Sequence, residues 1–105
     1  LLKRAVAIVE KNMDNIEFST DEFAREMNMS RSNLHLKLKA ITGESTIDFI
    51  RKIRFNEAAK LLKDGRYTIA EVSTMVGFNT PSYFATSFKK YFGCLPTEYI
   101  KKAKG

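Results

Sequence analysis

With 105 residues, 44% of them hydrophobic, the chain is long enough for one domain or two small lobes that share a spine, and too apolar to be disordered. Eighteen basic and 12 acidic residues give a net charge of +6, which suits a polyanion such as nucleic acid or an anionic membrane surface, or serves solubility alone. No apolar run approaches the ~18–20 residues of a membrane span, and no signal-peptide pattern is present, so we expect a cytoplasmic domain without membrane contact.

Residues that build metal sites and active sites are scarce. Cys94 is the only cysteine and His35 the only histidine, so no intramolecular disulfide can form, and we expect neither a metal nor a cofactor. No carboxylate pair, nucleophile with a base, or glycine-rich phosphate loop stands in a suitable context, so we expect no enzyme and no small-molecule ligand. Because the chain begins at Leu1 rather than Met, we expect a fragment of a longer protein.

Helix start signals recur along the chain, and no segment alternates as a strand would. Most starts are a hydroxyl residue followed three positions later by an acid: Ser19 and Glu22, Ser45 and Asp48, Thr68 and Glu71. Further starts lie at Ser30 and at Thr80 before Pro81, and stops lie near Gly43, Gly65, Gly77 and Gly93. The predicted fold class is therefore all-α, with about seven helices over residues 1–13, 20–27, 31–42, 46–63, 69–76, 81–92 and 97–104.

The chain repeats itself at an offset of about 50 residues. Residues 23–29 (FAREMNM) match residues 72–78 (VSTMVGF), and residues 34–50 match residues 84–100. Each copy reads as a short helix, a tight turn with Asn28 or Gly77 where a positive φ is needed, and a longer helix. The small residue of each short helix, Ala24 or Ser73, allows the next helix to cross closely. This pattern is typical of helix-turn-helix architecture; a paired-helix solenoid is the alternative, but two copies are too few to stabilise one.

The repeat predicts two homeodomain-like lobes joined by a linker helix. We expect the first lobe over residues 1–45, the linker over 46–63 and the second lobe over 64–105. The linker's stretch from Ile47 to Leu62 would be ~24 Å long and could hold the two longer helices in successive major grooves, ~34 Å apart. Its expected buried residues are Ile50, Ile53, Ala58, Leu61 and Leu62, whereas Arg51, Lys52 and Arg54 could face DNA or solvent.

A 100° helical wheel separates a core side from an outward side on the two longer helices. The predicted core residues are Leu34, Leu38 and Ile41 in the first, and Phe84, Phe88 and Tyr91 in the second. The candidate base-facing residues are Ser32, His35 and Leu36 in the first, and Ser82, Ala85 and Thr86 in the second. The candidate phosphate contacts are Arg31, Asn33, Lys37, Lys39, Asn79, Thr80, Lys89 and Lys90, each lysine being equally readable as a solvated surface charge.

The outward faces differ in what they can read. His35 can donate to or accept from a base edge, and Leu36 can pack against a thymine methyl. Ala85 and Thr86 are short, so we expect the second helix mostly to anchor the chain through Lys89 and Lys90 and the first to discriminate between sequences.

Residues 29–34 (MSRSNL), Leu38-Lys39 and Thr42-Gly43 resemble the first helix-turn-helix of the AraC/XylS family of bacterial transcription regulators. Residues 69–72 (IAEV), 76–78 (VGF), 82–84 (SYF) and 88–90 (FKK), with Gly93, Pro96 and Tyr99, resemble that family's signature in the second. The resemblance covers about residues 5–102 and implies a seven-helix, bilobal domain that binds DNA and activates transcription. The run at 37–43 (KLKAITG) is most similar to hybrid two-component regulators, which carry sensor, kinase and receiver in the same chain.

The resemblance also implies base-reading positions at Ser32, His35 and Leu36 and at Ser82 and Thr86, although many members carry arginine at the position of Leu36 and a longer polar residue at that of Thr86. The expected partners are a double-stranded DNA operator and RNA polymerase. The competing hypothesis is a helical adaptor that docks on another protein. An adaptor would show a continuous exposed apolar stripe on residues 31–42 or 81–92, whereas the wheels place polar residues there.

Overall fold

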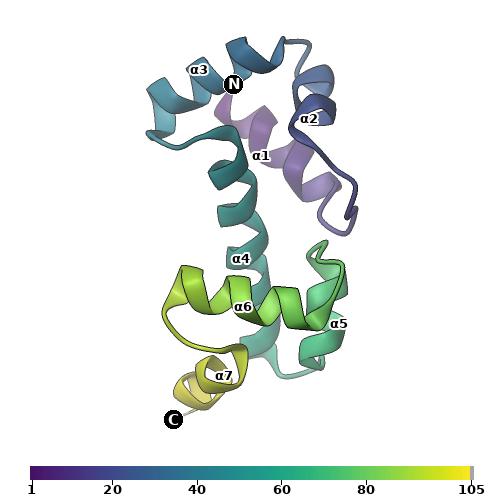
Figure 1. Ribbon diagram of the computed structural model, residues 1–105, viewed down its shortest axis with the longest axis vertical. Helices are drawn as coiled ribbons and strands as arrows, with labels where there is room; N and C mark the ends of the chain where they lie inside the picture. The colour runs from purple at the N-terminus through teal and green to yellow at the C-terminus, as the bar shows by residue number, and fades with distance from the viewer. Residues whose placement is uncertain (105) are drawn as a thin grey trace. The chain divides into compact units, whose positions relative to one another are not determined.

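The computed structural model describes residues 1–104, which form seven α-helices and no strand in that range (Figure 1). The helices are α1 (Leu2–Lys11), α2 (Thr20–Glu26), α3 (Arg31–Thr42), α4 (Thr46–Asp64), α5 (Ile69–Met75), α6 (Pro81–Phe92) and α7 (Pro96–Lys104). The predicted all-α fold class is thus confirmed. No helix in the described range is both long enough and apolar enough to cross a membrane.

Side-chain caps fix where most of these helices begin. The hydroxyl oxygens of Ser19, Ser30, Thr68 and Thr80 each accept a hydrogen bond from the backbone N–H three residues later, at 3.1–3.2 Å. Such a cap satisfies one of the N–H groups that a first helical turn leaves without a partner. The Thr68 cap is reciprocal, because the carboxylate of Glu71 accepts from the Thr68 N–H at 2.8 Å. The predicted bounds of α3 and α6, residues 31–42 and 81–92, are accordingly confirmed.

The first helix is shorter than the predicted span of residues 1–13. After Lys11 the backbone tightens, and the N–H groups of Asn12 and Met13 bond to the carbonyls three residues earlier, at 3.1 and 3.2 Å. The Asn12 side chain also donates to the Ile8 carbonyl at 2.9 Å, which competes with continuation of the helix.

The chain divides into two compact units, residues 1–53 and residues 54 onward, with the division inside α4. Each unit has its own hydrophobic core. In the first unit the core brings together residues from α1, α2, α3 and the start of α4. Its buried members are Ala5, Val9, Phe18, Phe23, Ala24, Met27, Leu34, Leu38, Phe49 and Ile50.

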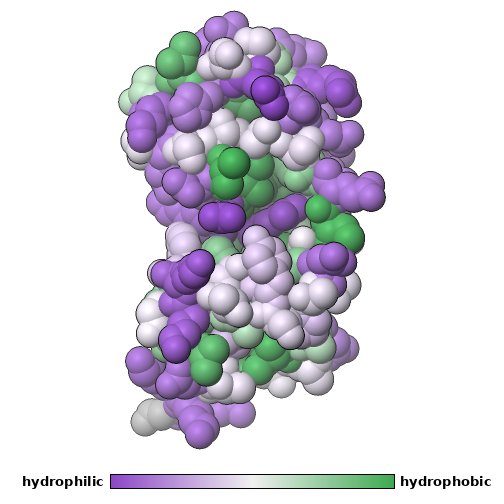
Figure 2. All heavy atoms as spheres, viewed as in Figure 1, coloured by the Kyte–Doolittle hydropathy of each residue, from purple (hydrophilic) through white to green (hydrophobic). Residues whose placement is uncertain are grey.

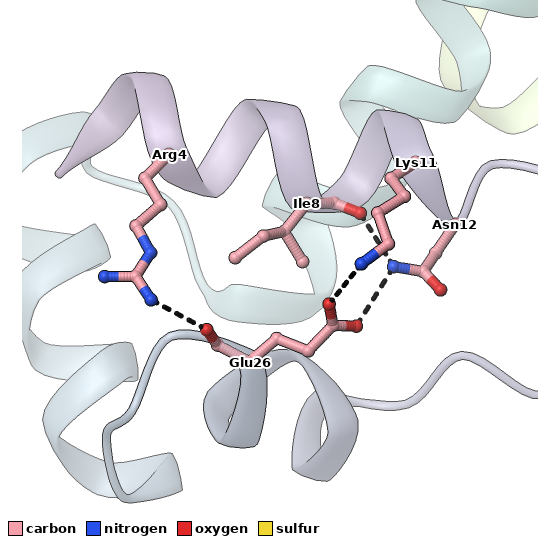
Figure 3. Close-up of polar contacts among 5 residues, drawn as sticks. All are labelled: Arg4, Ile8, Lys11, Asn12 and Glu26. Carbon is pink, nitrogen blue, oxygen red and sulfur yellow. Dashed lines mark hydrogen bonds and ion pairs between the residues drawn. The ribbon is translucent and has the colours of Figure 1, made fainter.

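A polar cluster fastens α1 to the end of α2 in the first unit (Figure 3). The Glu26 carboxylate accepts from Lys11 Nζ and Asn12 Nδ2, both at 3.1 Å, and the Glu26 carbonyl accepts from Arg4 Nη2 at 3.1 Å. One residue therefore binds both ends of α1, which holds α1 against the first helix of the predicted helix-turn-helix.

The core of the second unit is largely aromatic. The Phe88 ring lies 4.5–6.3 Å from the rings of four neighbours, measured between ring centroids, in tilted or edge-on arrangements that favour aromatic pairs. These neighbours are Phe55, Phe84, Phe92 and Tyr99.

Two of the predicted core residues are not buried. Ile41 is 53% exposed, because it lies in the last turn of α3, outside the cluster that encloses Leu34 and Leu38. Tyr91 is 43% exposed, yet its ring stacks on Phe55 with centroids 4.8 Å apart, so one face packs against the core and the rest meets solvent.

The linker helix α4 buries a different set of residues from the one predicted. Ile50, Ala58 and Leu62 are buried as expected, whereas Ile53 and Leu61 are only half buried. The sequence analysis missed the two largest buried side chains of α4, Phe49 and Phe55. Phe49 stacks on Phe23 in the first unit and Phe55 on Tyr91 in the second, so α4 contributes an aromatic ring to each core.

Candidate nucleic-acid interface

Each unit contains a short helix, a tight turn and a longer helix, and the two turns have matching backbone geometry (Figure 1). Asn28 in the first turn has φ +58° and Gly77 in the second has φ +83°, the left-handed conformation that the sequence predicted at both positions. In the first turn the Met29 N–H donates to the Ala24 carbonyl at 3.0 Å. In the second, the Phe78 N–H donates to the Ser73 carbonyl at 2.8 Å.

The small residues predicted at the helix crossings are buried. Ala24 is 3% exposed and Ser73 is 1% exposed. A hydroxyl so deeply buried needs a partner, and Ser73 Oγ donates to the Ala70 carbonyl of its own helix at 2.7 Å. The two α-helical pairs, α2–α3 and α5–α6, are therefore built as helix-turn-helix units.

The structure places the predicted outward residues of α3 and α6 on the surface. Those of α3 are all exposed: Ser32, His35, Leu36 and Lys39. In α6, Ser82, Thr86 and Lys89 are exposed and Ala85 is half buried. The two helices each have 12 residues and begin and end at equivalent residues, so these quartets occupy the same positions in each.

The surface over α6 is of intermediate hydropathy rather than a continuous apolar stripe where α6 faces the viewer in Figure 2. The large apolar residues exposed on α3 are Leu36 and Ile41, which lie five residues apart and so point in different directions. The exposed stripe that an adaptor helix would present is thus missing from the visible face of α6 and from α3.

The starts of α3 and α6 differ in the number of backbone donors that they offer to a phosphate. In α3 the Asn33 N–H is bound by the Ser30 cap, while the N–H groups of Arg31 and Ser32 have no partner among the described residues. In α6 the first residue is Pro81, which has no N–H, so one donor fewer remains. Both helix starts can attract an anion through the helix dipole.

Some of the candidate phosphate-binding side chains already make a contact within the chain, whereas the lysines make no ion pair in the described range. Arg31 already pairs with Asp21, with Arg31 Nε and Asp21 Oδ1 3.2 Å apart, and the hydroxyl of Thr80 serves as the α6 cap. The lysines of both longer helices are exposed and have no ion pair within residues 1–104; they are Lys37, Lys39, Lys89 and Lys90. Asn33 and Asn79 are also exposed.

The three cations in the first half of α4 that could face DNA differ in their surroundings. Lys52 pairs with Glu44, with Lys52 Nζ and Glu44 Oε1 3.7 Å apart, while Arg51 is exposed. Arg54 is half buried, and this burial lowers the pKa of its guanidinium from the ordinary value because it removes water from the charged form.

Two features of the surface were missed by the sequence analysis. One is the Arg31–Asp21 ion pair, which joins residues of different helices and leaves no sign in a sequence pattern. The other is a hydrogen bond within α6, in which Thr86 Oγ1 donates to the Ser82 carbonyl at 3.0 Å. A threonine inside a helix often bonds back to the carbonyl four residues earlier, so the spacing of Ser82 and Thr86 could have indicated it.

Two helix-turn-helix units with exposed, basic longer helices define a DNA-binding domain. A family model described as a helix-turn-helix domain matches residues 23–102. The chain belongs to this family, the AraC-type helix-turn-helix domains, which are the DNA-binding parts of transcription regulators. It is accordingly a DNA-binding domain that acts in the regulation of transcription.

Similar proteins include regulators of several kinds. The C-terminal domain of AraT, a response regulator from Geobacillus stearothermophilus, is 32% identical with a TM-score of 0.88, covering 96% of this chain and 84% of that one. The transcriptional regulator MtrA of Neisseria gonorrhoeae is 31% identical over 95% of this chain and 34% of its own length. Histidine kinase P4 of Formosa agariphila is 41% identical over 94% of this chain and 7% of its own length. This chain spans only 7–36% of the length of the curated relatives that it matches first.

Proposed function

We propose that the chain is the DNA-reading part of a bacterial transcription activator and that α3 and α6 enter successive major grooves of one operator. The observation that carries this proposal is the matched pair of 12-residue helices, each with a hydroxyl cap at its start, a left-handed glycine after its end and the same outward positions.

Base reading is proposed for the outward residues of the two helices: Ser32, His35, Leu36, Ser82, Ala85 and Thr86. Phosphate binding is proposed for Arg31, Asn33, Lys37, Lys39, Asn79, Thr80, Lys89 and Lys90. The exposure of the candidate side chains on α3 supports these roles, as does the lack of ion pairs to the four lysines within residues 1–104. Phosphate contacts fix the position of the helices, and base contacts supply the sequence preference.

For the parent protein, we propose a hybrid two-component regulator, whose DNA-binding domain, this chain, works in the cytoplasm and acts on RNA polymerase. Support comes from the similarity to a histidine kinase in which the matching segment is 7% of the length, and to the C-terminal domain of a response regulator. In such a protein this chain would deliver the output of a signalling cascade to a promoter.

The test is to select bound sequences from a random pool of duplex DNA with the purified 105-residue chain. Affinity for a selected duplex is then measured against salt concentration, with a scrambled duplex of the same composition as the control. If about six phosphates are neutralised, log K falls with log salt at a slope near −5. Failure to enrich any sequence, or an affinity that does not change between low and moderate salt, would contradict the proposal.

A further inference from the structure

We propose that the sixth residue of each longer helix, Leu36 in α3 and Thr86 in α6, reads the methyl group of a thymine. The operator would then carry a thymine at equivalent places in its two halves. This inference rests on the proposed function, because it names the base that the proposed reading faces recognise.

Leu36 is the clearest apolar group on the outward face of α3. It is 65% exposed and lies between His35 and Lys37, both exposed, in the part of the helix that carries the candidate base contacts. Among the base edges of the major groove, thymine alone presents an apolar group, its C5-methyl. A leucine side chain offers no hydrogen bond, so contact with that methyl is the base-specific interaction that it can make.

Thr86 presents a similar surface for a different reason. Its Oγ1 donates to the Ser82 carbonyl at 3.0 Å, so the single hydroxyl hydrogen is already used inside α6. The side chain therefore has no hydrogen left to donate to guanine N7 and O6, adenine N7 or thymine O4. Its γ-methyl group remains, beside the half-buried methyl of Ala85.

The register of the two helices places Leu36 and Thr86 in equivalent positions. Ser30 and Thr80 cap the starts, and Gly43 and Gly93 follow the ends, each 50 residues apart. Two helices that dock in the same way would therefore bring these two side chains to the same depth in their grooves. Leucine and threonine differ in polarity. Because the hydroxyl hydrogen of Thr86 is bound inside α6, however, both side chains present mainly an apolar group to the groove.

One other interaction is open to Thr86. Its oxygen retains lone pairs that could accept a hydrogen bond from adenine N6 or cytosine N4. The two interactions can be separated, because the methyl group and the hydroxyl group can each be removed alone.

The first experiment removes the methyl from the DNA. In a duplex selected by the 105-residue chain, each thymine is replaced in turn by deoxyuridine, which keeps base pairing and lacks the C5-methyl. One replacement in each half of the site should lower affinity by about fourfold, which is the effect of losing the burial of one methyl-sized group. The other replacements should change the affinity little. If no replacement lowers affinity while sequence selection is intact, the inference is wrong and the proposed function stands.

The second experiment removes groups from the protein. Thr86→Val keeps the methyl and loses the hydroxyl, and should keep the sensitivity to deoxyuridine in the second half of the site. Thr86→Ser keeps the hydroxyl and loses the methyl; it should lose about fourfold in affinity and become insensitive to deoxyuridine in the second half of the site. Leu36→Ala should abolish the sensitivity in the first half alone.

Each remaining outcome also decides the matter. If Thr86→Val loses affinity while Thr86→Ser retains it, the hydroxyl reads the base, and methyl reading by α6 is wrong. If the chain selects no sequence from the pool, the proposed function fails, and this inference fails with it. Circular dichroism melts of all three variants should match the unaltered chain, since both positions are exposed.

Discussion

The two helix-turn-helix units have the same helix lengths at their longer helices but use charge in opposite ways. Residues 1–53 contain nine basic and eight acidic residues, whereas residues 54–105 contain nine basic and four acidic ones. Within residues 1–104, four ion pairs lie in the first unit and one in the second. The first unit is thus nearly neutral, with four of its nine cations in ion pairs, while the second carries an excess of five cations that can attract phosphates without regard to sequence.

The cores differ as well. The first unit packs aliphatic residues of α1 and α3 around three phenylalanines, and the second surrounds Phe88 with other aromatic rings. Both cores support the same backbone arrangement, which shows that the helix-turn-helix geometry depends on turn conformation and buried volume rather than on one set of residues.

The largest expected effects come from truncating the centre of each core. Phe88→Ala should lower the free energy of unfolding by ~3–5 kcal/mol and Leu38→Ala by ~2–5 kcal/mol, because both side chains are fully buried and leave cavities. Both variants should lose DNA binding through loss of the folded state. Thermal and denaturant unfolding, followed by circular dichroism, measures the change.

Ile41→Ala is the matched control for Leu38→Ala, one turn further along α3. Ile41 is 53% exposed, so its truncation should alter stability by less than about 0.5 kcal/mol. An unchanged melting temperature in Leu38→Ala or Phe88→Ala, together with lost binding, would show that these residues touch DNA instead.

Ile41 also shows which part of the fold the sequence could not predict. Caps and glycines are local signals, so the bounds of α3 and α6 follow from Ser30, Thr80, Gly43 and Gly93. A helical wheel gives the direction of a side chain but not whether another element reaches its level on the helix. It therefore placed Ile41 with Leu34 in the core, although the structure leaves Ile41 exposed.

For the candidate site, the sequence predicted which residues face outward but not which polar contacts they make. The helical wheel predicted the outward positions of each helix, and the internal repeat made the two sets equivalent, because two helices in the same register must present the same faces. Polar contacts between helices were not predictable: Arg31 pairs with Asp21 across ten residues, and Glu26 binds Lys11 across fifteen. Such pairs depend on how the helices pack, which no local pattern encodes.

The next effect concerns sequence discrimination. We expect the first unit to discriminate more, because His35 can form a hydrogen bond with a base edge. His35→Ala should relax the base preference in one half of the operator by ~1–3 kcal/mol at one base pair, since a hydrogen bond to a base edge is lost. Because His35 is exposed, the melting temperature should hardly change. The measurement is a binding scan over every single-base variant of the selected site.

The same scan on the unaltered chain shows whether the first unit is the more discriminating. Ala85 holds the position of His35 in α6 and offers no hydrogen bond, and a methyl contact from Thr86 accounts for about fourfold. Stronger discrimination in the half of the operator under α6 would reverse the assignment.

The smallest effect compares two phosphate-binding candidates, Lys89 of α6 and Arg31 of α3. Lys89→Ala should weaken binding to all sequences alike, by up to about tenfold near 0.1 M salt, and flatten the salt slope by about one unit. Arg31→Ala should weaken binding less, because Arg31 must give up the Asp21 carboxylate, 3.2 Å away, before it can bind a phosphate fully. Equilibrium binding of each variant at several salt concentrations measures both quantities.

Lys60→Ala controls for charge alone. Lys60 is an exposed lysine of α4 outside the proposed interface, so its loss changes the net charge as Lys89→Ala does without removing a proposed contact. If Lys60→Ala flattens the slope as much as Lys89→Ala, net charge and not position governs the affinity of the second unit. A change in base preference in Lys89→Ala would instead make this lysine a base contact. Equal losses in Lys89→Ala and Arg31→Ala would mean that the ion pair with Asp21 does not restrain Arg31, and the contrast in charge between the units would have no consequence for binding at these two positions.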